Sequence, residues 1–431
     1  MFQFINLLVK NMNRSLTILL GVGVVAVVVV LVVALISNTS GAGTTTTVAQ
    51  GTVEIPIGVM VSLTGDLESY GPLYRAAAQL AEQDINSFFS SINSPYRMKV
   101  YFEDDKSTPE GALAAAQSFA ARGIKIVFTY TSSATSAVKS FASQNDMIII
   151  SYASTAPHLA IPGDNVFRLE PPDTFQARGI AALIKELGVD RVIVIYRGDD
   201  WGDGLYRALS QRLAELGGSV IAGIRYDPAS KDLSAEVASL ADYVRREQNI
   251  SRVGIVALSF PGDFLSLFNA AMRYPELMSV KWFGSDGTVD DVKIRDVLGQ
   301  KIVDSGVLFI NLRFFTAEYP HQERLAARYR NMTGENPSEA AYGLYDGIWA
   351  VALSVVINNG STSGSQLVKV FPEIAYRYFG YSGWLLLDEN GDRAIATYAY
   401  RMLARTQNGI EWVTVGYFDG STGKVTLSLP H

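Results

Sequence analysis

Hydrophobic and polar positions alternate in a regular way from residue 53 onward. Short runs rich in β-branched residues, such as VEIPIGVMVSL at 53–63, predict buried strands. The segment 70–92 instead carries Leu73, Ala77 and Leu80 at the i, i+3/i+4 spacing of an amphipathic helix. Strands that alternate with helices are typical of a parallel sheet covered by helices on both faces.

This alternation extends over two blocks. In the first block, strands are predicted at 53–63, 97–105, 124–131 and 147–153, and helices at 70–92, 109–122 and 133–144. In the second block, strands are predicted at 191–198, 218–227, 253–260, 280–287 and 303–310, and helices at 173–187, 203–216, 232–247 and 263–273. The sequence EPPD at Glu170–Asp173 interrupts the alternation, and its two prolines favour a passage there from one lobe to the other.

After residue 311 the pattern changes. Helices are predicted at 320–332, 338–358 and 363–376, and residues 383–416 resemble antiparallel strands turned at Asp388–Asp392. Helices without a sheet of their own should complete the first lobe, and the last strands should extend the second. We therefore expect two α/β lobes, made of 53–170 plus 312–378 and of 171–311 plus 379–431, with a ligand cleft between them.

A run of 21 residues without a charge, Leu16–Ile36, precedes these blocks. At about 1.5 Å of rise per residue, such a helix can cross a hydrocarbon core of about 30 Å. Because Lys10 and Arg14 precede the run, residues 1–15 should stay in the cytoplasm, and the chain beyond the Ser/Thr/Gly-rich linker at 37–52 should lie outside. A cleaved signal peptide is the alternative, although its apolar core is usually shorter. We expect a membrane-anchored extracytoplasmic protein, or a secreted one if the segment is cleaved.

Composition narrows the classes of function. The 431 residues have a formal net charge of −6, which disfavours a nucleic-acid partner. The chain has no Cys and only three His, which excludes a thiolate nucleophile and a Cys-ligated metal. It also lacks the G-x-S-x-G, H-E-x-x-H and complete P-loop motifs. We therefore expect neither an enzyme nor a metal or cofactor.

Hydroxyl side chains follow two neighbouring strands of the first block. Ser132 and Ser133 open a helix after one strand, and Ala153 and Thr155 follow the next. A helix N-terminus with hydroxyl donors is suited to binding a carboxylate. Taken by itself, the Ser132-Ser133 motif could instead be an ordinary N-cap. Because the carboxyl ends of parallel strands meet at one edge of a sheet, both motifs should face the same crevice.

An acidic residue and three aromatic residues occupy similar junctions. Asp286 ends a strand of the second block, where it could bind an ammonium group across the cleft or form an Asx-turn beside its glycines. Tyr70, Trp201 and Phe260 also stand between predicted strands and helices. They could wall a pocket for an apolar or cationic group, or pack in the core.

The motifs of the chain, taken in order, resemble those of one family. They are IPIGVMVSLTG (55–65), Tyr70-Gly71, EDDKSTPEGA (103–112), TSSATS (131–136), SYASTAP (151–157), FRLEPPD (167–173), DDWGDGL (199–205), FGSDG (283–287) and YDG (345–347). From about 53 to 428 the chain resembles the substrate-binding proteins of ABC importers, in the branched-chain amino-acid (Leu/Ile/Val) class with the type I periplasmic-binding fold. The resemblance implies two doubly wound Rossmann-like lobes, joined by three crossovers, that close on a ligand and then dock on a permease.

The same resemblance implies roles for individual residues. They are Ser132, Ala153 and Thr155 for the ligand α-carboxylate, Asp286 for its α-ammonium, and Tyr70, Trp201 and Phe260 along the pocket. Trp201 is larger than the tyrosine that is usual at its position in the family, so the resemblance does not identify the side chain of the ligand. We expect a receptor that captures an amino acid, branched-chain or another apolar or small zwitterion, for an ABC permease with its ATPases. The alternatives are a ligand-sensing receptor for amides or other small solutes, acting with a partner chain, and a structural surface protein without a ligand.

Overall fold

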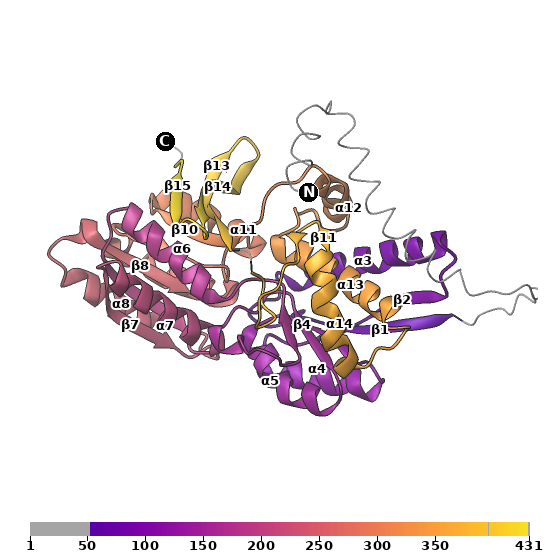
Figure 1. Ribbon diagram of the computed structural model, residues 1–431. Helices are drawn as coiled ribbons and strands as arrows, with labels where there is room; N and C mark the ends of the chain where they lie inside the picture. The colour runs from indigo at the N-terminus through magenta and orange to yellow at the C-terminus, as the bar shows by residue number, and fades with distance from the viewer. Residues whose placement is uncertain (1–51, 395, 430–431) are drawn as a thin grey trace, which may run out of the picture. The chain divides into compact units, whose positions relative to one another are not determined.

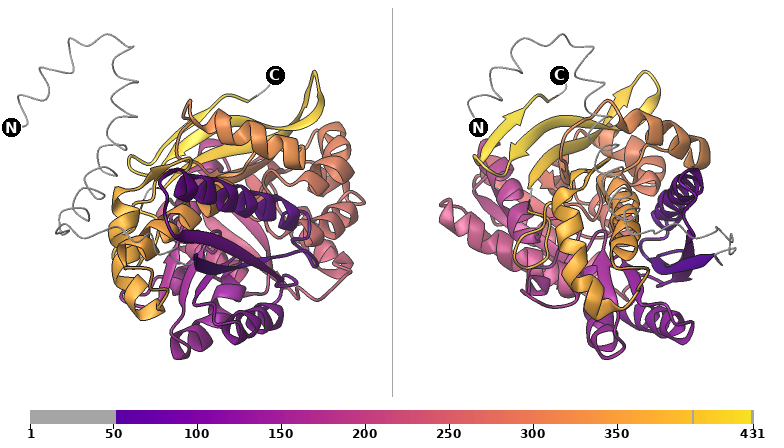
Figure 2. Two further views of the ribbon diagram at one scale, coloured as in Figure 1. Left: turned by 90° about the vertical axis from the view of Figure 1, so that its right-hand side faces the viewer. Right: turned by 45° about the vertical axis from the view of Figure 1, so that its right-hand side comes forward.

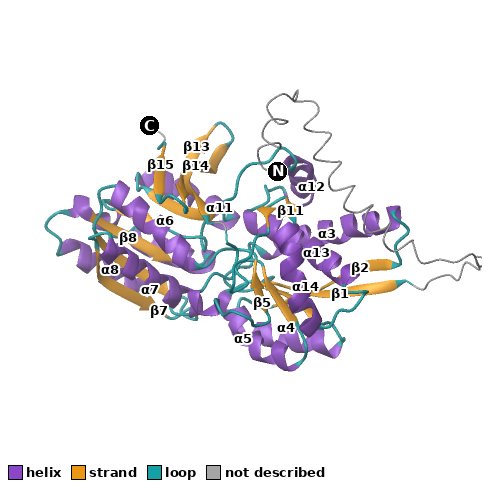
Figure 3. Ribbon diagram, viewed as in Figure 1, coloured by secondary structure: helices purple, strands orange, loops and turns teal. Residues whose placement is uncertain are grey.

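The computed structural model describes residues 52–394 and 396–429. Two large sheets with helices packed against them, and one small two-stranded sheet, make up this part of the chain (Figure 1). Figure 3 distinguishes these helices and strands by colour. The predicted membrane segment at 16–36 lies outside the described residues.

The first sheet contains five parallel strands in the order β2-β1-β3-β4-β5. They are β1 (Val53–Val61), β2 (Tyr96–Asp104), β3 (Ile126–Thr129), β4 (Ile148–Ser151) and β5 (Val166–Arg168). The helices of this lobe are α3 (Gly71–Ser91), α4 (Pro109–Ala121), α5 (Ser132–Gln144), η1 (Pro157–Leu159), α12 (Gln322–Thr333), α13 (Glu339–Ile357) and α14 (Gly364–Arg377). Every residue of β3 and β4 is buried, as expected for central strands covered on both faces. Helix α3 runs alongside β1 and β2 (Figure 2).

The second sheet has eight strands in the order β15-β14-β13-β10-β9-β8-β6-β7. Its parallel strands are β6 (Arg191–Arg197), β7 (Ser219–Tyr226), β8 (Val253–Leu258), β9 (Lys281–Phe283) and β10 (Phe309–Phe314). The strands β13 (Thr397–Thr406), β14 (Gly409–Asp419) and β15 (Lys424–Leu427) add to β10 in antiparallel fashion, so this sheet is mixed. The helices of this lobe are α6 (Asp173–Glu186), α7 (Asp200–Glu215), α8 (Ser234–Arg245), η2 (Ile250–Arg252), α9 (Pro261–Ala271), α10 (Pro275–Met278) and α11 (Val292–Ser305).

Two local predictions are wrong. The expected strand at 303–310 begins only at Phe309, because the buried residues Ile294, Leu298 and Ile302 continue the helical pattern of α11 until Gly306 ends it in the left-handed conformation. The tight turn at Asp388–Asp392 does form, but it closes only a single bridge between its flanking residues. The long hairpin β13–β14 turns later, between Thr406 and Gly409, and the short strands β11 (Phe379–Gly380) and β12 (Gly383–Trp384) pair with each other.

Within the described residues the chain passes between the two sheets three times: after β5, after β10 and before β13. A buried ion pair joins the first of these passages to the third. Arg168 donates two hydrogen bonds to Asp392, at 2.5 and 2.6 Å, and both side chains are almost wholly inaccessible to solvent. Arg393, also buried, donates to the carbonyl oxygens of Leu169 and Ser382. These contacts fix the segments about which two lobes of this kind would pivot.

Among the described residues, α13 is the one helix long and apolar enough to cross a membrane. Most of its residues are buried, and it packs against α3 and α14. It also carries a buried carboxylate, Asp346, which accepts hydrogen bonds from the backbone N–H groups of Tyr381 and Ser382. These features are those of a core helix.

Candidate functional site

A cavity of about 360 Å³ lies between the two sheets. Loops that follow the carboxyl ends of parallel strands supply much of its wall. On the first sheet these are Tyr70 after β1, Tyr130 to Ser132 after β3, Ala153 after β4 and Glu170 after β5. On the second sheet they are Trp201 after β6, Phe260 after β8 and Asp286 after β9. Both the volume and the position are typical of small-molecule sites in α/β proteins.

Ser132 connects the two hydroxyl-rich loops. The helix α5 begins at Ser132, after Thr131 caps it by accepting a hydrogen bond from the N–H of Ala134 at 3.1 Å. The Ser132 hydroxyl accepts hydrogen bonds from the N–H groups of Thr155 and Ala156, at 3.2 and 3.1 Å. The N-terminus of α5, with its partial positive charge, is thereby fixed against the loop after β4.

The other candidate residues of these two loops differ in whether they line the cavity. Ala153 lines the cavity beside Ser132, whereas Thr155 and Ser133 are not among the residues that line it. The Thr155 side chain is nevertheless buried, and its hydroxyl faces the carboxylates of Asp173 and Asp286, where it lowers the pKa of both.

Asp286 lies on the wall formed by the second sheet. Its backbone N–H donates to the Gln176 side chain at 2.9 Å, and the amide of that side chain donates to Asp173 at 2.7 Å. The Oδ1 atom of Asp286 is buried and has no hydrogen-bond partner among the described residues. Burial raises the pKa of Asp286 to about 6, because the carboxylate has lost solvation by water. A ligand cation would restore the missing partner.

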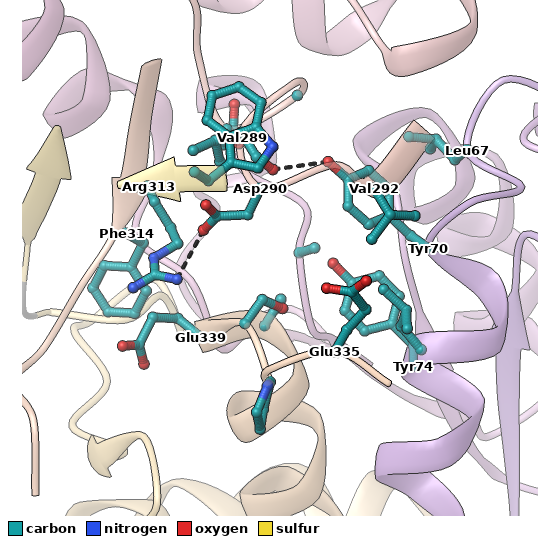
Figure 4. Close-up of a pocket in the computed structure, with 18 of the residues that line it drawn as sticks. Leu67, Tyr70, Tyr74, Val289, Asp290, Val292, Arg313, Phe314, Glu335 and Glu339 are labelled. Carbon is teal, nitrogen blue, oxygen red and sulfur yellow. Dashed lines mark hydrogen bonds and ion pairs between the residues drawn. The ribbon is translucent and has the colours of Figure 1, made fainter. Parts of the chain in front are cut away.

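Aromatic side chains line the same cavity. Trp201 stacks on Phe260 with ring centroids 4.9 Å apart, and the guanidinium of Arg197 lies over the Phe260 ring at 4.4 Å. Tyr70 reaches from the first lobe to donate a hydrogen bond to the Val289 carbonyl at 2.9 Å (Figure 4). These rings are buried, so they offer rigid apolar walls to a ligand.

Six of the eight candidate residues therefore line one cavity, and they are Tyr70, Ser132, Ala153, Trp201, Phe260 and Asp286. Their role in binding a ligand stays a prediction. Sequence analysis missed several charged lining residues, namely Glu170, Asp290, Arg295, Arg313, Glu335, Glu339, Arg401 and Glu411. Of these, Glu170 had a signal, because it belongs to the FRLEPPD motif, but that motif indicated only a lobe boundary and the family resemblance. Most of the others come from the part of the chain after residue 311, where the sequence shows no alternation of strands and helices.

Two groups of these charges pair with one another. Asp290 accepts hydrogen bonds from Arg313 at 2.8 Å and from Arg401 at 2.9 Å, and Figure 4 shows the contact with Arg313. Glu335 forms a two-pronged ion pair with Arg295. The residues that the structure describes contain no group of three or more His, Asp or Glu side chains arranged to bind a metal ion.

Comparison with known proteins finds a matching family model and related binding proteins. The family model described as "Receptor family ligand binding region" matches residues 73–403. A protein of Methanocaldococcus jannaschii described as uncharacterized is 31% identical over 401 residues, which span 88% of this chain and 94% of that protein. The Leu/Ile/Val-binding protein of Citrobacter freundii is 27% identical over 252 residues, 57% of this chain and 65% of that protein.

Solved structures show the same fold. A leucine-binding protein from Thermotoga maritima superposes with a TM-score of 0.70 at 18% identity, over 83% of this chain and 97% of that one. The branched-chain amino acid transporter substrate-binding protein of Streptococcus pneumoniae, in complex with isoleucine, gives a TM-score of 0.67 at 19% identity, over 84% of this chain and 99% of that one. These similar proteins are described as binding proteins and not as enzymes.

Proposed function

The chain belongs to the receptor ligand-binding family, as a solute-binding protein of the Leu/Ile/Val type with the type I periplasmic-binding fold, and we propose that it captures an amino acid and delivers it to an ABC importer. The observation that carries the proposal is a cavity lined by groups of both kinds that a zwitterion needs. The N-terminus of α5 with its hydroxyl groups offers donors to an anion, and Asp286 offers a carboxylate whose buried Oδ1 atom has no hydrogen-bond partner among the described residues.

The α-carboxylate of the ligand would bind beside Ser132 and Ala153. Hydroxyl and backbone N–H donors at a helix N-terminus stabilise an anion through hydrogen bonds and through the helix dipole. Thr155 would contribute its hydroxyl if loop closure turned it from the carboxylates of Asp173 and Asp286 toward the ligand.

The α-ammonium would bind Asp286. The Oδ1 atom of Asp286 is buried, so an ion pair with the ligand there is stronger than it would be at an exposed site. Tyr70, Trp201 and Phe260 would then contact the apolar part of the ligand. Leucine and isoleucine, which appear in the descriptions of similar structures, are the first ligands to test.

Delivery would use a closed form of the two lobes. Polar contacts already join the two lobes. The Ser69 hydroxyl donates a hydrogen bond to Oδ2 of Asp291 at 2.5 Å, and Nζ of Lys293 donates one to Oε1 of Glu68 at 2.6 Å. A membrane anchor at 16–36 would keep the receptor beside its permease and raise its effective concentration there.

The proposal can be tested by a thermal-shift screen of the full-length chain in detergent. The panel would contain the common L-amino acids together with amides, urea and polyamines. Ligand at about 100 times its Kd should stabilise the folded protein by about 2.7 kcal/mol. A shift with a subset of amino acids would support the proposal. A shift with neutral amides alone would favour the sensing function, and no shift from folded, ligand-free protein would contradict a receptor for either class.

A further inference from the structure

A second carboxylate, Glu170, lines the cavity and has no evident structural role. Its residue is only 8% exposed, although it carries a charged group. Within the described residues, no hydrogen bond or ion pair reaches its side chain. An acid in such surroundings that faces a cavity without a protein partner suggests a partner that binds from outside.

The buried carboxylate of Asp346 in the same lobe shows how this protein satisfies a structural acid. Asp346 accepts hydrogen bonds from the N–H of Tyr381 at 3.0 Å, and from the N–H and the hydroxyl of Ser382 at 2.6 and 2.7 Å. Glu170 has none of these donors and opens into the cavity instead. The difference points to a ligand contact.

The charges around Glu170 are mainly negative. Asp286 and Glu339 line the same cavity, and one oxygen of each is buried without a hydrogen-bond partner among the described residues. The arginines that line the cavity donate their hydrogen bonds to Asp290 and Glu335, and Arg313 also lowers the pKa of Glu339. Buried Arg393 offsets part of the negative charge, but it donates to carbonyl oxygens of the passages between the lobes. One α-ammonium bound at Asp286 would leave Glu170 without a cationic partner of its own, whereas Arg313 and Arg393 offset the charge of Glu339.

We propose that the ligand carries a second cationic group and that Glu170 binds it, an inference that rests on the proposed function. The site would then select a basic amino acid such as lysine, ornithine or arginine. Glu339 would add to the negative field around this group. Tyr74 and Tyr130 line the cavity with their rings 5.0 Å apart, and they could receive the cation on an aromatic face.

Ionisation of Glu170 supplies a second observable. Burial, and then the neighbouring charges of Asp286 and Glu339, raise the pKa of Glu170 well above its ordinary value, while Arg393 lowers it and Asp173 raises it slightly further. The free site should therefore retain a proton on Glu170 near neutral pH. A cationic ligand favours the carboxylate, so its binding should release that proton.

The experiment compares L-lysine with L-norleucine, which has the same carbon skeleton without the ε-ammonium. Isothermal titration calorimetry on the full-length chain in detergent should show lysine binding at least about tenfold more tightly, because a desolvated carboxylate gains a charged partner. Glu170→Gln should reduce this lysine-to-norleucine ratio to near one. Glu110→Gln, at an exposed position in α4, should leave the ratio unchanged.

Titrations in two buffers of different ionisation enthalpy would count protons on the wild-type chain itself. Lysine should release more protons than norleucine. Equal release, or tighter binding of norleucine than of lysine, would overturn the role of Glu170 while leaving the amino-acid receptor intact. Failure of every amino acid to bind folded protein would overturn the proposed function together with this inference.

Discussion

The guanidinium of Arg197, at the end of β6 in the second sheet, donates a hydrogen bond to the carboxylate of Asp66 in the loop after β1 of the first sheet, at 2.9 Å. Arg197 is almost fully buried and also contacts Asp199 and Asp263. The backbone of the same loop accepts a hydrogen bond from the N–H of Gly262. Arg197 of the second lobe thus forms an ion pair with a residue of the first lobe.

Asp66→Asn should weaken ligand binding, because it removes a charge that favours the arrangement in which the lobes contact each other. We expect a loss of about 1 kcal/mol, or about fivefold in Kd, for a partly exposed member of a larger network. Calorimetry with the best ligand of the screen would measure it. The matched control is Asp203→Asn, which removes an ion pair to Arg225 within the second lobe. Equal effects of the two variants would contradict a role for the contact between lobes.

Asp286→Ala should reduce amino-acid affinity by at least about 2 kcal/mol, or about thirtyfold in Kd, because the α-ammonium would lose its charge partner. Asp242→Ala, which removes an exposed carboxylate on α8, should leave the affinity unchanged. Titration calorimetry of both variants gives the comparison. An unchanged Kd for Asp286→Ala would exclude this role.

Binding should weaken at acidic pH. The ammonium needs the ionised form of Asp286, and the pKa of Asp286 in the free protein is about 6. Affinity should therefore be fully developed about one pH unit or more above 6, and it should fall by up to about tenfold per pH unit below 6, since a proton competes with the ligand. Kd values for leucine at pH 7.5, 6.0 and 5.0 would test this. A constant Kd over that range would show that Asp286 does not titrate in the site.

Much of the fold could be predicted because its signals are local. The periodicity of 70–92 and the apolar run at 53–63 correspond to α3 and β1, whose residues bury the expected faces. Ser132 and Asp286 could be proposed because polar residues at the carboxyl ends of strands converge in this class of fold.

Other features depend on contacts distant in sequence. Glu339 begins a helix that no strand precedes, so nothing in its neighbourhood indicates that α13 brings it to the cavity. The turn at Asp388–Asp392 has a genuine local signal, yet its strand partners are decided by tertiary packing, and Asp392 instead pairs with Arg168. Neither outcome is encoded in local periodicity.

That pair leads to a prediction for stability. Arg168 and Asp392 have side chains that are 0% and 1% exposed, and they connect the first and third passages between the lobes. Arg168→Met would leave the Asp392 carboxylate buried without its cation, so it should lower the free energy of unfolding by about 3–5 kcal/mol. Arg191→Met is the matched control: Arg191 makes the same two-pronged contact with Glu247, but its side chain is 45% exposed, and the expected loss is at most about 1 kcal/mol. Urea unfolding of the two variants would measure the difference. Similar losses would mean that the Arg168–Asp392 pair contributes no more than a surface ion pair, and that apolar packing alone maintains the hinge.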